Sequence, residues 1–150
     1  MAAGLLLTYC KGPSSGPLVK ESFDGKEQEK AAPSGRHTGK VVTSKIDVKI
    51  EPCADCVTIG KLLENSKSYE GKVIRVKGQV TKYNGGILGK NWIHIQDGTE
   101  YGEGFDLTIT TDIAAQVGET VTFEGKIALD KDFGYGYAYD VIMEDAGPVQ

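Results

Sequence analysis

Histidines and long apolar runs are scarce in this chain of 150 residues, and each scarcity excludes a class of protein. No stretch reaches the roughly 18 consecutive apolar residues that a membrane-spanning helix requires, so nothing in the sequence predicts one. The only histidines are His37 and His94, and neither stands directly after Cys56 in the CxxC pair of Cys53 and Cys56. Covalent attachment of a c-type haem is therefore excluded.

Sequence patterns for catalysis are missing as well. We find no nucleophile–base pair, no paired carboxylates in a glycosidase-like frame and no GxxxxGK[ST] phosphate loop. Four aspartates could attract a hard cation, but they follow no EF-hand spacing: Asp97, Asp106, Asp130 and Asp132. We therefore expect a protein that is not an enzyme and that holds neither a cofactor nor a metal.

The composition fits one small domain with a tail. Hydrophobic residues make up 39% of the chain, which is low for a sequence that is ordered throughout. Residues 1–57 hold 8 Lys/Arg and 7 Asp/Glu, whereas residues 58–150 hold 9 and 14. The domain is therefore acidic and has no general attraction to phosphate backbones.

Residues 72–146 contain five runs in which apolar residues recur at every second position, separated by glycine-rich breaks. The expected strands are residues 73–83, 91–96, 105–110, 120–129 and 137–143. Thr58 is expected to cap a short helix over 58–66, and residues 111–117 form a short helix or turn. Residues 84–90 are too glycine-rich for a strand. This order predicts an all-β fold, a five-stranded OB-fold Greek-key barrel.

An OB-fold usually binds its ligand on the outer face of strands two and three, between the loops that join strands one to two and four to five. Aromatic rings there can stack on nucleic-acid bases or on sugars. The basic residues are interrupted by aspartates, so nucleic-acid binding should be modest and salt-sensitive. Two alternatives remain: Trp92 plugs the barrel end or covers the helix, and His94 is an exposed strand residue without a ligand. The expected ligand-binding residues are Tyr83, Lys90, Trp92, His94, Gln96, Thr108, Thr110, Lys131, Phe133, Tyr135 and Tyr137.

The first third of the chain has a different character. Residues 1–10 resemble the end of a bacterial lipoprotein signal, which implies lipidation of Cys10; the alternative is a disordered cytosolic terminus with an incidental cysteine. The Gly-, Pro-, Ser-, Lys- and Glu-rich stretch that follows, to residue 39, should be a disordered tether. Residues 41–50 alternate again and predict an extra strand. Cys53 and Cys56 could form a disulfide, remain free thiols or supply half of a zinc site.

Three strings in the domain, GKNWIHIQDGT, DLTITT and DKDFGYGYAYDVIMEDA, resemble a family of bacterial envelope OB-fold proteins described as nucleic-acid-binding or nucleotide-binding, several of them lipoproteins. The resemblance covers residues 58–146. It implies the OB-fold and an extracytoplasmic setting, although fold alone does not determine function.

Together these observations predict three segments: a signal remnant and tether (1–39), an extra strand with the CxxC pair (40–57) and an OB-fold domain (58–147). We expect a binding module anchored by lipid on the periplasmic side of a bacterial envelope, with single-stranded nucleic acid or a nucleotide as partner. The alternatives are a periplasmic binder of a small molecule or glycan, and an accessory subunit of an envelope complex.

Overall fold

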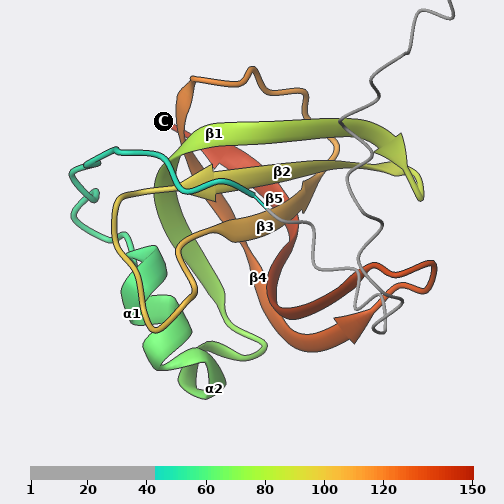
Figure 1. Ribbon diagram of the computed structural model, residues 1–150, viewed down its shortest axis with the longest axis horizontal. Coiled ribbons are helices and arrows are strands. Elements are labelled where there is room, and N and C mark those ends of the chain that lie inside the picture. Colours follow the sequence, from blue (N-terminus) through green and yellow to red (C-terminus); the bar gives the residue numbers. More distant parts are fainter. Residues whose placement is uncertain (1–42) are drawn as a thin grey trace, which may run out of the picture. The chain divides into compact units, whose positions relative to one another are not determined.

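The computed structural model describes residues 43–150 (Figure 1). The predicted all-β class is confirmed, because strands dominate and the helices are short. The elements are α1 Ile59–Glu64, α2 Ser66–Tyr69, β1 Val73–Ile87, β2 Lys90–Gln96, β3 Leu107–Thr111, β4 Thr120–Asp132 and β5 Ala138–Val149. Predictions that concern residues 1–42, including the tether and Cys10, lie outside the described residues.

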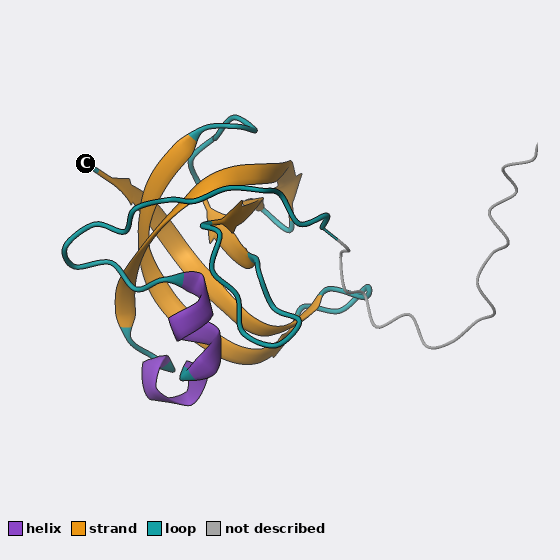
Figure 2. Cartoon of the chain, turned by 60° about the vertical axis from the view of Figure 1, so that its left-hand side comes forward, coloured by secondary structure: helices purple, strands orange, loops and turns teal. Residues whose placement is uncertain are grey.

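The strands form one sheet with the order β1-β2-β3-β5-β4, and β1 also pairs with β4. The sheet therefore closes on itself. All neighbouring strands are antiparallel except β3 and β5, which run parallel. Figure 2 shows the closed sheet from the side, with both helices below it. The outer face of β2 and β3 is the surface on which the candidate site is built.

Alternate residues of the strands point into the closed sheet and form its core. The fully or nearly fully buried core residues are Ile59, Leu62, Val76, Val80, Ile93, Ile95, Leu107, Ile109, Phe123, Ile127, Met143 and Ala146. Two of them, Ile59 and Leu62, belong to α1, so this helix also contributes to the core. As the sequence predicts, the Thr58 hydroxyl caps α1, accepting from the Lys61 backbone N–H at 3.4 Å.

The prediction of a loop over residues 84–90 is wrong, because β1 continues to Ile87 and β2 begins at Lys90. Leu88 and Gly89 alone connect the strands, with φ of 54° and 74°. Positive φ at both central residues is the backbone of the hairpin turn whose twist matches antiparallel strands. A register irregularity between Asn84 and Ile87 accommodates the glycines. The many glycines therefore shape a hairpin rather than an irregular loop.

Other boundaries also differ from the sequence prediction. β5 continues six residues past Met143, to Val149, although its acidic and glycine-proline residues look like strand breakers. Residues 112–119 form bends and a turn, which is one of the two predicted alternatives. The predicted extra strand is wrong for residues 43–50, which have no strand assignment. Within residues 43–150, no helix is long and apolar enough to cross a membrane.

Candidate functional site

The outer face of β2 and β3 holds five of the predicted ligand-binding residues. Trp92 lies opposite Thr110 and His94 lies opposite Thr108 across the two strands, with Gln96 further along β2. All five are buried, with exposed fractions of 5% or less. This face is therefore covered, and the groups that cover it determine what can bind there.

At one end of this face, Trp92 packs in a group of rings that we call the aromatic cluster: Trp92, Phe133, Tyr137 and Tyr139. The Trp92 ring is stacked on Tyr139 at a centroid distance of 5.6 Å and meets Phe133 edge-on at 5.0 Å. Tyr137 lies tilted at 5.7 Å. The indole N–H donates to the Ile87 carbonyl at 2.8 Å. Trp92 is thus buried, as in the alternative left open above, but beside rings of the β4–β5 hairpin and outside the main core.

The β4–β5 hairpin reaches Trp92 because its strands continue beyond the core. Leu129 and Val141 lie opposite each other and pack against the core, and Lys131 and Tyr139 are the next pair on the same hairpin face. Phe133 and Tyr137 follow, with the Phe133 N–H donating to the Tyr137 carbonyl at 2.8 Å. The same face of the hairpin therefore first covers the core and then covers Trp92.

The tip of this hairpin is a turn with three consecutive positive φ values, 78° at Gly134, 54° at Tyr135 and 84° at Gly136. The Asp132 carboxylate stabilises the turn by accepting from the Gly134 N–H at 2.8 Å. Tyr135 is 92% exposed and does not join the aromatic cluster. The sequence prediction grouped it with Phe133 and Tyr137, but the tip turns its ring toward solvent.

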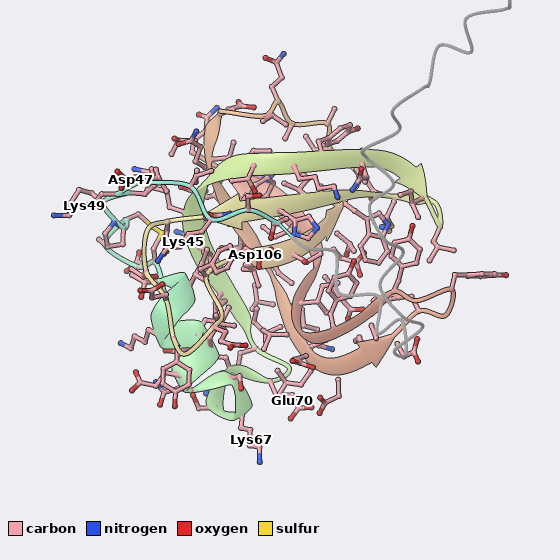
Figure 3. All side chains as sticks on the ribbon, in the orientation of Figure 1. Lys45, Asp47, Lys49, Lys67, Glu70 and Asp106 are labelled. Atoms are coloured by element: carbon pink, nitrogen blue, oxygen red, sulfur yellow. A yellow bond between two sulfur atoms is a disulfide. The ribbon has the colours of Figure 1, made fainter. Side chains whose placement is uncertain are left out.

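The middle of the face is occupied by His94 and Asp106. His94 Nδ1 lies 2.7 Å from Asp106 Oδ2, and Thr108 Oγ1 approaches the same nitrogen at 3.4 Å. An ionised carboxylate only accepts, so Nδ1 donates in this bond. His94 is 2% exposed, so the alternative of an exposed strand histidine is wrong. Asp106, labelled in Figure 3 near the centre of the view, retains a side-chain exposure of 24%.

Tyr139 belongs to the aromatic cluster and also interacts electrostatically with Asp106, the partner of His94. Burial raises the pKa of the Tyr139 hydroxyl, and the neighbouring Tyr137 and Asp106 act in the same direction. A carboxylate close to the phenol disfavours the phenolate form. The candidate site therefore combines a ring surface with a partly accessible carboxylate whose position is fixed by a buried histidine.

At the other end of the face, residues 43–50 run beside Gln96, and we call this segment the strap. The Gln96 side-chain amide is bonded at both ends, because Oε1 accepts from the Ile46 N–H at 2.9 Å and Nε2 donates to the Ser44 carbonyl at 2.9 Å. The Ile50 N–H donates to the Asp97 carbonyl at 3.1 Å. Figure 2 shows the strap crossing the strands before the chain turns back to α1.

The strap lies so close to the turn after β2 that only glycine fits there. A Cβ atom on Gly98, which has a φ of +88°, would lie 2.0 Å from the Val48 carbonyl oxygen. Lys45 also forms an ion pair with Glu100. Within the strap, Ile46, Val48 and Ile50 are half-buried and Asp47 and Lys49 are exposed, so the predicted alternation is present without a strand. Figure 3 shows Asp47 and Lys49 directed away from the sheet.

The remaining predicted site residues lie elsewhere or are engaged. A register shift between Val80 and Lys82 places Tyr83 opposite Ile93, so it packs against the core and not beside Trp92. Lys131 pairs with Glu144 at 3.3 Å. Lys90 pairs with both Asp112 and Asp145, each at 3.0 Å, and the Asp145 N–H donates to the Thr110 hydroxyl at 3.2 Å.

The sequence prediction missed Tyr139, the pairing role of Asp106, and the strap. Tyr139 could have been found, since it continues the alternation of rings from Phe133 through Tyr137. The sequence identifies Asp106 only as an acidic residue, and nothing near His94 marks it as the partner. No local signal connects the strap to Gln96, about 50 residues away.

Cys53 and Cys56 are joined by a disulfide. Cys56 forms a bridge with Arg75 of β1, and the next residue, Val57, donates its N–H to the Arg75 carbonyl at 2.8 Å. Arg75 in turn pairs with Glu124 at 2.6 Å, and this carboxylate raises the pKa of the guanidinium. Among residues 43–150, no group of three or more ligating side chains could hold a metal ion.

No family model matches this chain, and no curated protein matches it significantly. The likeness to envelope OB-fold proteins therefore stays a prediction from the three sequence strings, and the site must be interpreted from its own geometry.

Proposed function

We propose that residues 58–147 form an OB-fold domain. The support is the strand order. β1 pairs with both β2 and β4, and β3 runs parallel to β5. The extended β4–β5 hairpin beside the outer face of β2 and β3 occupies the place where this fold has a wall of its ligand site. The turn between β3 and β4 replaces the helix that the sequence order allowed there.

We further propose that the domain is a non-enzymatic binding module for a small, uncharged ring compound such as a sugar. The observation on which this rests is the aromatic cluster lying next to the partly exposed Asp106 carboxylate. A ring can stack on Tyr139, and Asp106 can accept hydrogen bonds from hydroxyl or amino groups of the same ligand.

The size of the face also favours a small ligand. From Trp92 to Gln96 is four residues, which at the rise of a β-strand is about 13 Å. The hairpin covers one end of this stretch and the strap covers the other. The accessible part is therefore shorter than this length and lies beside Asp106, where a ligand of one or two rings fits and a run of several nucleotides does not.

The charges near the site favour a ligand without phosphates. Lys90 and Lys131, the two lysines among the predicted ligand-binding residues, are each paired with carboxylates. A nucleic acid would have to replace these partners, so little attraction remains for its backbone. Single-stranded nucleic acid or a nucleotide is the second candidate, since stacking rings and the family resemblance favour it.

Binding can be followed through Trp92, which is the only tryptophan of the chain. The full chain is titrated with a chitotriose-type oligosaccharide, with adenosine and with a short oligothymidylate, each at low and high salt. We expect an uncharged probe, the oligosaccharide or adenosine, to change the Trp92 fluorescence. This change should be the same at low and at high salt. Tight oligothymidylate binding that weakens steeply with salt would support the second candidate, and no binding of any probe would contradict both.

Two variants locate the site. Asp106→Asn keeps the shape but weakens the acceptor, and we expect about tenfold weaker binding, as for a lost charged hydrogen bond. Tyr135→Ala is the control, since this ring is exposed and outside the cluster. Equal loss of binding in both variants would contradict the proposed surface.

We also propose that the protein is a lipid-anchored protein of the bacterial envelope. The disulfide between Cys53 and Cys56 supports this, because disulfides persist in oxidising compartments and are rare in the cytosol. The resemblance of residues 1–10 to a lipoprotein signal supports the anchor.

A further inference from the structure

The chain segment between the strap and α1 is hydrogen-bonded to the same residue, Asp97, at both of its ends. Asp97 accepts from the Ile50 N–H through its backbone carbonyl at 3.1 Å and from the Ile59 N–H through its Oδ2 atom at 2.8 Å. Asp97 is 3% exposed. Residues 51–58 therefore form a loop with both ends fixed at the end of β2, next to Gln96.

The disulfide lies in the middle of this loop. Cys56 is fixed to the sheet by its bridge with Arg75 and by the following Val57 bond. Cys53 lies only three residues after Ile50, the last strap residue, and the bond to Cys56 ties it to this fixed point. A turn bond from the Cys56 N–H to the Cys53 carbonyl at 3.0 Å supports the same geometry. The disulfide thus closes residues 53–56 into a ring and shortens the link between the strap and the point at which the chain is bonded to β1.

We propose that the Cys53–Cys56 disulfide is a redox lock that keeps the strap on the outer face of β2. A dithiol reductant opens it: the sulfur–sulfur bond breaks, Cys53 and Cys56 each gain a proton and an electron, and the reductant becomes a disulfide. Both cysteines are partly exposed, so a reductant can reach them. The ring of residues 53–56 then opens, so the strap is tethered less tightly to the Cys56–Arg75 bridge and leaves the Gln96 end of the face.

The consequence for the ligand face rests on the proposed function. With the strap in place, both ends of the Gln96 amide are occupied by Ser44 and Ile46. Without it, the amide becomes available to a ligand next to His94 and Asp106. Reduction is therefore expected to enlarge the accessible face at the end opposite the aromatic cluster.

The first measurement is amide hydrogen exchange on the full chain, in the oxidised protein and in the Cys53→Ser/Cys56→Ser variant. We expect the Ile46 and Ile50 amides to exchange at least about tenfold faster in the variant. The internal controls are the Val80 N–H, which donates to the Glu119 carbonyl, and the Ile127 N–H, which donates to the Lys72 carbonyl. The exchange rates of these two amides should not change. Unchanged strap exchange would overturn the proposal, and faster exchange of the control amides would show that the disulfide holds the whole fold.

The second measurement tests whether the strap controls access. Diethylpyrocarbonate modifies accessible imidazoles, and His94 and His37 are distinguished by peptide mass, with His37 as the reagent control. We expect faster modification of His94 in the serine variant. Gly98→Ala, which displaces the strap while leaving the disulfide intact, should give the same increase without reduction.

If the strap amides exchange faster but His94 is still modified slowly in both variants, the strap does not control access to the face, and that part of the proposal is overturned. Neither readout uses a ligand, so failure of the sugar titration would leave this result standing, and failure here would leave the titration standing.

Discussion

Gly98 is the residue whose substitution tests the strap most directly. Alanine there must adopt a φ near +88°, which costs about 1–2 kcal/mol. Its Cβ would also lie 2.0 Å from the Val48 carbonyl, so the strap has to leave. The three hydrogen bonds that hold the strap are each worth about 0.5–1.5 kcal/mol net. The exposed Lys45–Glu100 pair adds little. We expect Gly98→Ala to lower the free energy of unfolding by about 3–6 kcal/mol.

Gly118→Ala is the matched control, because Gly118 has a φ of +93° and no atom within 4 Å of its added Cβ. This variant should lose only the backbone part, about 1–2 kcal/mol. Urea unfolding followed by Trp92 fluorescence gives both free energies. The difference between the two variants measures the strap. Equal losses, together with unchanged exchange of the Ile46 amide, would refute the reasoning.

Three further predictions concern the aromatic cluster and the anchor. Trp92→Ala should lower the free energy of unfolding by about 3–5 kcal/mol in urea unfolding followed by circular dichroism, whereas Tyr135→Ala should change it by less than about 0.5. Burial raises the pKa of Tyr139 above its ordinary value of 10.0, so the unfolded chain loses this proton first and stability falls as the pH rises above about 10; Tyr139→Phe should remove this part of the pH dependence. Cys10→Ser should abolish incorporation of labelled palmitate in a bacterial host, and an unlabelled parent protein would contradict the anchor.

The strands could be predicted from the sequence because their signal is local. Ile93 and Ile95 alternate with Trp92 and His94, and a period of two residues identifies a strand whatever its partner. The same alternation correctly separated the core side of β2 from its outer side. The hairpin turn at Leu88 was missed because a leucine with positive φ is rare and the pairing of its flanking strands overrides local preference.

The site was harder to predict because it depends on register and on distant partners. One irregularity between Val80 and Lys82 moves Tyr83 from the outer to the inner side, and no residue type marks it. The aromatic cluster could not be predicted without knowing how far the β4–β5 hairpin extends. The contact between His94 and Asp106 could not be predicted without knowing which residues lie beside His94 in the folded protein. Such contacts arise from tertiary packing and leave no periodic pattern in the sequence.

The parallel pairing of β3 with β5 has a consequence for how this protein is made. β5 comes after the other four strands of the sheet along the sequence, and it supplies the neighbour of both β3 and β4. Until it arrives, one edge of each of those strands has no partner, so the ring cannot be completed on a growing chain. A nascent chain that has been synthesised only as far as residue 137 therefore exposes two unpaired strand edges, and we expect it to be prone to aggregation until β5 is added.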